Sequence, residues 1–150
     1  MPNGRTHRVV GAAAGSAYAL YRAGHQAPAH ALIETLGGAL AGAVGARLPD
    51  VLDPPLHPRH RSLAHGLVPV AVAGRVGAMA LDRCQVRLRA EAEHRASLRR
   101  AAVTPLQRVW HAIVEVLCRL GAGAMAGLLA GYGSHVALDA FTPASIPLVA

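Results

Sequence analysis

Histidine and aspartate residues that could bind a metal ion lie at the ends of the apolar segments of this 150-residue chain. His7 precedes the first apolar segment, and His135 and Asp139 close the last one. The link between the second and third segments contains further residues of these types: Asp50, Asp53, His57, His60 and His65. Imidazole and carboxylate groups are ligands for zinc, iron, manganese and nickel. If successive segments run as antiparallel helices, all of these residues meet at one end of the bundle, which predicts a metal site there.

The most regular spacing is that of His135 and Asp139, which are four residues apart. On a helix, residues with this spacing share one face, so both side chains can reach one ion. Ionisable side chains inside an apolar segment are costly, and in membranes they usually serve a function. The same pair would also suit a helix surface, or a histidine satisfied within the core.

The polar link adds residues with several possible roles. His60 and His65 flank a turn at which both imidazoles can converge, and Asp50 lies closest to the end of the second segment. Asp50 and Asp53 would alternatively serve as helix-end or turn residues. Arg61 adjoins His60 and could stabilise a phosphate-like charge, contact a lipid headgroup or form an ion pair within the loop. Asp50 and Arg61 are therefore the candidates for catalytic groups beside the metal.

Helices are expected to position these residues, because none of the apolar segments alternates with the period of a strand. The segments cover roughly residues 9–21, 31–46, 63–81 and 109–139. The arginine-rich stretch 82–108 indicates one more, solvated helix that ends before Thr104, and the Pro-rich run 49–58 is expected to be an extended loop. The sequence thus predicts an all-α fold. It would be a small bundle of about four apolar helices plus one arginine-rich helix, forming a single domain over residues 1–150.

Composition favours association of this bundle with a membrane. Hydrophobic residues make up 53% of the chain and charged residues 15%, against about 25% charged in an average soluble domain. Gly123, Gly127 and Gly131 have the spacing of helices that pack closely in lipid, although a Gly/Ala-rich chain also produces it by chance. Glu34 and Glu115 lie within apolar segments, where each is expected to pair with an arginine.

The net charge of +7 would suit either nucleic acid or an anionic membrane surface. Nucleic-acid binding is not expected, because aromatic residues for base stacking are only 3% of the chain. Residues 120–138 form the segment best suited to span a bilayer. Membrane lipid is therefore the expected partner, and the arginine-rich stretch is a further candidate surface for a protein partner.

Four blocks of the sequence resemble the YdjM-type family of inner-membrane-associated metal-dependent hydrolases, sometimes described as LexA-binding. The blocks are THRVVG, LPDVLDP, HRSLAHGL and GYGSHVALDAFTPASIPLV. The resemblance covers nearly the whole chain, except the stretch at about 82–108, which looks like a variable insert. It implies a set of metal ligands: His7, Asp50, His60, His65, His135 and Asp139. Asp53 is a further candidate, although it follows Asp50 by three positions where the family usually has two.

The resemblance also implies a location at the bacterial inner membrane, but it supplies no substrate. Metal-bound water, a nearby arginine and the lack of a motif for a covalent nucleophile predict a metal-dependent hydrolase, with a phosphoester as the leading substrate class. We expect one or two divalent transition metal ions, zinc first, with manganese or nickel as alternatives. The sequence allows two other hypotheses: a non-catalytic membrane scaffold with a structural metal site, and a soluble helical binding domain without metal. A homo-oligomer is compatible with each.

Overall fold

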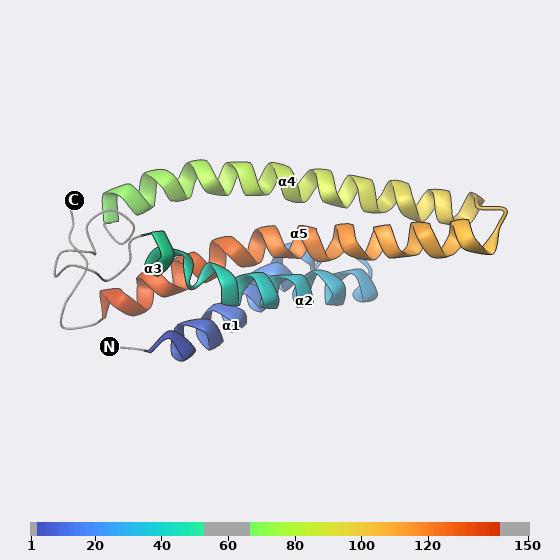
Figure 1. Cartoon of the computed structure of the whole chain (residues 1–150). Helices are drawn as coiled ribbons and strands as arrows, with labels where there is room; N and C mark the ends of the chain where they lie inside the picture. Colours follow the sequence, from blue (N-terminus) through green and yellow to red (C-terminus); the bar gives the residue numbers. More distant parts are fainter. Residues whose placement is uncertain (1–2, 53–66, 142–150) are drawn as a thin grey trace.

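The computed structural model describes residues 3–52 and 67–141, with the side chains of its fourth helix described from Gly74 onward (Figure 1). The described residues form helices and no strand: α1 (Gly4–Ala23), α2 (Pro28–Gly45), α3 (Leu48–Leu52), α4 (Leu67–Ala101) and α5 (Pro105–Ala140). The prediction of an all-α fold is therefore confirmed. The chain runs up α1, back along α2, up α4 and back along α5, as the antiparallel arrangement predicted (Figure 1).

One helix replaces two that the sequence predicted separately. The third apolar segment and the arginine-rich stretch are continuous in α4, which has 35 residues. The stretch is rich in Ala, Arg, Leu and Glu, which are strong helix formers, so nothing local interrupts the helix at residue 82. The next helix, α5, begins with Thr104 as its N-cap and Pro105 in its first turn, and Thr104 and Gln107 form a capping box.

The Pro-rich run also differs from its prediction, because its first residues are helical. α3 begins at Leu48 and contains Pro49. Proline is tolerated in the first turn of a helix, where its missing N–H would have no partner within the helix. The consequence is that Asp50 belongs to a short helix and not to an extended loop.

Glycines allow α1, α2 and α5 to pack closely against one another. A side chain added at Gly127 or Gly131 of α5 would overlap the backbone of Gly38 or Gly42 in α2. The same is true where Gly15 of α1 crosses α2. The prediction of close packing through glycine spacing is therefore confirmed.

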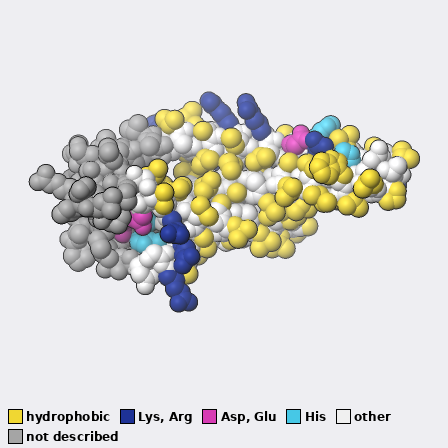
Figure 2. All heavy atoms as spheres, in the orientation of Figure 1, with side chains coloured by type: hydrophobic (Ala, Val, Ile, Leu, Met, Phe, Trp, Pro, Cys, Tyr) yellow, Lys and Arg dark blue, Asp and Glu magenta, His cyan; other side chains and the backbone are white. Residues whose placement is uncertain are grey.

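Large apolar side chains, by contrast, face outward. On α2, the side chains on the outer face are spaced by four residues and are all exposed: Leu32, Leu36, Leu40 and Val44. Figure 2 shows hydrophobic side chains across the visible surface of the described helices. Within residues 3–52 and 67–141, two helical segments could cross a membrane by length and composition: Pro28–Leu52 and Pro105–Ala140. Small residues inside and large apolar residues outside are what a bundle surrounded by lipid requires.

The two ends of the bundle differ in build. At one end lie the beginning of α1, α3 and the end of α5 (Figure 1). At the other end, the hairpin formed by α4 and α5 extends past the turn between α1 and α2 (Figure 1). Among the residues described, the backbone of α4 packs against α5 and does not come close to α1, α2 or α3.

Candidate metal centre

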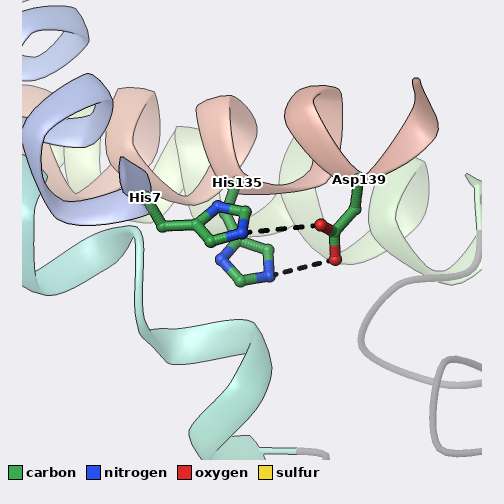
Figure 3. Close-up of side chains that lie close together, drawn as sticks. All are labelled: His7, His135 and Asp139. Atoms are coloured by element: carbon green, nitrogen blue, oxygen red, sulfur yellow. Dashed lines mark ion pairs between the residues drawn. The ribbon is translucent and has the colours of Figure 1, made fainter. Parts of the chain in front are cut away.

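Three buried side chains of metal-ligating type meet at the end of the bundle that holds α3. His7 comes from the first turns of α1, and His135 and Asp139 come from the last turns of α5 (Figure 3). The exposed fractions of these residues are 4%, 0% and 3%, respectively. Their ligand atoms all lie within 4.8 Å of one another. The helical spacing of His135 and Asp139 thus does put both groups on one face, and the fold adds a histidine from the far end of the sequence.

The Asp139 carboxylate faces both imidazoles from one side (Figure 3). One of its oxygens, Oδ1, is 3.5 Å from His7 Nε2, and the other, Oδ2, is 3.5 Å from His135 Nε2 (Figure 3). The two rings are stacked, with centroids 4.0 Å apart and an angle of 24° between their planes. This stacking places both Nε2 atoms on the side of the carboxylate.

A backbone carbonyl fixes the orientation of His135. Its Nδ1 atom is 2.6 Å from the oxygen of Ala46, at the C-terminal end of α2. A carbonyl oxygen only accepts hydrogen bonds, so we assign the proton to Nδ1, and Nε2 of the neutral ring then carries a lone pair. Metal-binding histidines commonly donate their second ring N–H to a carbonyl or carboxylate in this way.

Asp50 adds a fourth group from α3. Its Oδ1 is 3.5 Å from His135 Nε2, and its side chain is 47% exposed. Asp50 therefore stands at the edge of the cluster, whereas the other three residues are enclosed. We call His7, Asp50, His135 and Asp139 the metal centre from here on.

The distances within the metal centre are compatible with a shared metal ion. Charge-assisted hydrogen bonds between nitrogen and carboxylate oxygen have lengths of about 2.7–2.9 Å, shorter than the 3.5 Å found for three pairs here. Tetrahedral ligands at about 2.0–2.1 Å from zinc are about 3.3–3.4 Å apart. Two imidazoles and one carboxylate are also a known donor set for catalytic zinc, which keeps its fourth position for water.

Several residues predicted from the sequence lie outside the described residues. These are Asp53, His57, His60, Arg61 and His65. Their assignment as ligands or, for Arg61, as a catalytic group stays a prediction. The structure brings together His7, Asp50, His135 and Asp139 without them.

A second buried polar cluster joins α2, α4 and α5 near the end of the bundle opposite α3. The guanidinium of Arg119, which is fully buried, lies 2.8 Å from Glu93 Oε1, 3.1 Å from Gln26 Oε1 and 3.4 Å from Glu115 Oε1. Arg89 of α4 is 2.6 Å from the buried Glu34 of α2. The expectation that Glu34 and Glu115 pair with arginine is confirmed. Arg99 lies 3.3 Å from the other oxygen of Glu115, Oε2. We call five charged residues of this network the arginine cluster: Glu34, Arg89, Glu93, Glu115 and Arg119.

Sequence reasoning gave no role to Arg89 and Arg119. The available signal was the pair of glutamates inside apolar segments, since a buried carboxylate requires a cation beside it. Nothing in the sequence identified which of the many arginines would supply it.

Comparison with known families and proteins gives one match. The model of a family described as YdjM inner membrane protein matches residues 1–150, the whole chain. No curated protein and no solved structure matches the chain.

Proposed function

The chain belongs to the YdjM inner membrane protein family, and from this premise we propose that it is a metal-dependent hydrolase that works at the inner membrane. The metal centre would hold a divalent transition metal ion, zinc first and manganese or nickel as alternatives. When bound, such an ion lowers the pKa of water to about 7 and so supplies a nucleophile at neutral pH. The leading substrate class is a phosphoester.

The observation that carries this proposal is the burial of His7, His135 and Asp139 around one point (Figure 3). A carboxylate and two imidazoles inside an otherwise apolar bundle are costly to maintain. A neutral imidazole nitrogen and carboxylate oxygens that face one another repel, and a divalent cation held between them would turn this repulsion into attraction. A divalent ion is the cation for which this donor set is suited.

The residues of the chain have separable roles in this proposal. His7, His135 and Asp139 would hold the ion, and the carbonyl of Ala46 would keep Nε2 of His135 turned toward it. Asp50 is half-exposed at the edge of the centre. Its exposure supports the proposal that Asp50 would accept a proton from an attacking water, which is the role of a general base.

The direct test is the metal content of the full chain purified in detergent without chelator, measured by elemental mass spectrometry. We expect His135→Ala to weaken metal binding by about 100-fold or more, since even residues that only support a ligand contribute about 10–100-fold. The matched control is His25→Ala, because His25 is an exposed histidine in the turn at the opposite end of the bundle. Equal metal content in parent and His135→Ala would contradict the proposal.

Activity is tested with a panel of phosphomonoesters, phosphodiesters and phospholipids in the presence of zinc, manganese or nickel. We expect turnover that depends on metal and is lost in Asp139→Asn. Metal-loaded protein that hydrolyses none of these substrates would contradict the hydrolase assignment while leaving metal binding intact.

The position of Asp50 supports a second candidate function, a structural metal site in a non-catalytic membrane scaffold. Its Oδ1 lies as close to His135 Nε2 as Asp139 does, at 3.5 Å. Four protein ligands would close the site, as in structural zinc sites. In that case Asp50→Ala would lower metal affinity, removal of the metal would lower the melting temperature, and the metal-loaded protein would hydrolyse none of the substrates.

A further inference from the structure

An apolar groove of about 320 Å³ lies beside the metal centre, between α3 and α4, with α5 as its floor. Leucines line it from α3, α4 and α5, together with Tyr132 and two glycines of α4. Its volume is within the range of about 300–1,000 Å³ found for small-molecule sites. No charged residue contributes to the lining among the residues described.

Two glycines leave the groove open on the side of α4. A side chain added at Gly74 or Gly77 would meet nothing within 4 Å. This distinguishes them from Gly127 and Gly131 of α5, where an added side chain would overlap the backbone of α2. The glycines of α5 permit close packing of helices, whereas Gly74 and Gly77 border empty space.

The groove and the metal centre share two elements. α3 lies between them: Asp50 contacts the metal centre from one face of this short helix, and Leu48 and Leu52 line the groove from the opposite face. On α5, Tyr132 lines the groove one helical turn before His135. A molecule that extends from one site to the other would therefore be apolar in the groove and polar at the metal centre.

We propose that the groove holds the hydrocarbon chain of a lipid-like phosphoester whose headgroup lies at the metal centre. The proposal rests on the proposed function and adds the substrate class. In hydrolysis, the oxygen of water bonds to phosphorus, the bond from phosphorus to the leaving oxygen breaks, and a proton from the water ends on the leaving alcohol.

The membrane setting determines what the groove contributes. A lipid tail that enters the groove leaves other lipid tails, so it gains contacts but little hydrophobic free energy. The main gain is orientation, because a tail held in the groove places the headgroup at the metal centre. The groove should therefore favour substrates with a long chain over those with a short one.

The test compares two diesters with identical reacting atoms, 4-nitrophenyl dodecyl phosphate and 4-nitrophenyl methyl phosphate, using zinc-loaded full chain in one detergent. The variant is Gly77→Leu, which fills the groove. The matched control is Gly133→Leu on α5, because Gly133 also has nothing within 4 Å of an added side chain and lies outside the groove lining. Gly74→Leu serves as a second filling variant, and circular dichroism verifies that each variant is folded.

We expect Gly77→Leu to lower kcat/KM for the dodecyl ester by about tenfold, as overfilling of a packed site does, and to leave the methyl ester unchanged. Gly133→Leu should change neither. The groove would be overturned as a chain-binding site by either of two results. In one, each filling variant lowers kcat/KM equally for the dodecyl and the methyl ester; in the other, neither variant changes kcat/KM for either ester.

A binding measurement separates this proposal from the hydrolase assignment. Dodecylphosphonate has no ester bond to hydrolyse, so native mass spectrometry of the full-length protein with this compound reports ligand binding without turnover. Retention by the parent and Gly133→Leu but not by Gly77→Leu supports the groove even if neither diester is hydrolysed. Equal retention by Gly77→Leu and the parent overturns the groove even if hydrolysis is observed.

Discussion

The metal centre and the arginine cluster lie at opposite ends of one stripe of buried residues that runs along α2 and α5. Different groups accompany the buried carboxylates at the two ends. On α5 the stripe takes every fourth residue: Glu115, Arg119, Gly123, Gly127, Gly131, His135 and Asp139, all of them buried. On α2 the same spacing runs through Glu34, Gly38, Gly42 and Ala46. The middle of the stripe is glycine, so the helices touch there, and the ends are polar.

The difference between the two ends is the group that faces the carboxylate. A guanidinium is always charged and offers only hydrogen-bond donors, so an arginine beside a buried glutamate makes a complete ion pair. An imidazole is neutral or charged and, when neutral, has a lone pair that binds metals. The arginine cluster can therefore hold helices together, whereas the donor set of the metal centre is of the type that would suit an exchangeable ion. Burial alone does not distinguish the two ends of this bundle; the type of nitrogen group beside the carboxylate does.

The largest expected effect comes from the glycines that hold both ends together. Gly127→Leu would drive a side chain into the backbone of Gly38, so we expect a loss of stability of about 3 kcal/mol or more, together with loss of metal. The measurement is the melting temperature and metal content in detergent. Gly133→Leu is the control, since an added side chain there meets nothing within 4 Å. A Gly127→Leu protein with the stability of its parent would show that the helices do not pack through this stripe.

A change at the arginine cluster should separate the two ends. Arg119→Met removes a buried guanidinium and leaves the buried Glu115 with Arg99, 3.3 Å away, as its arginine partner. Removing one member of a buried ion pair costs about 3–5 kcal/mol when the other charge is left alone, so the retained Arg99 makes this an upper bound. We expect the melting temperature to fall and the metal content per folded chain to stay that of the parent.

For His135→Ala we expect the opposite of the Arg119→Met result on metal: the metal content per folded protein falls, as argued above. If Arg119→Met also released the metal from folded protein, the two ends would not be separate, and the comparison would fail.

Sequence reasoning predicted the parts of this molecule that depend on local pattern. The all-α class, the antiparallel course, the glycine contacts and the pairing of His135 with Asp139 all follow from residue spacing along a helix. The predicted boundary between the third apolar segment and the arginine-rich stretch was wrong because a change in polarity does not by itself end a helix, whereas a capping residue or a proline can. α3 was missed because a proline-rich run can still begin with a helical turn.

The meeting of His7, Asp50, His135 and Asp139 at one end of the bundle was predictable from the sequence, but its geometry was not. Topology alone placed His7 beside His135, which lies at the other end of the sequence. The role of the Ala46 carbonyl in orienting His135 depends on a side chain meeting the end of another helix, and no spacing within one helix encodes it. The same is true of the groove, which exists because α4 packs on α5 and stands away from α3.

The smallest expected effect is a pH dependence at the exposed edge of the arginine cluster. A hydrogen bond from Arg119, 2.8 Å from the carboxylate, is the main cause that holds the pKa of Glu93 below its ordinary value of 4.5, with burial acting in the opposite direction. Because the folded-state pKa is lowered, the stability that this pair contributes is fully present above pH 4.5 and is lost as the pH falls through the folded-state pKa. The Glu93 side chain is 63% exposed, so solvent screening limits the contribution to less than about 1 kcal/mol. We therefore expect Glu93→Gln to lower the melting temperature slightly at pH 7.5 and to bring it closer to that of the parent at pH 4. A difference between the two proteins that grows as the pH falls would contradict this assignment.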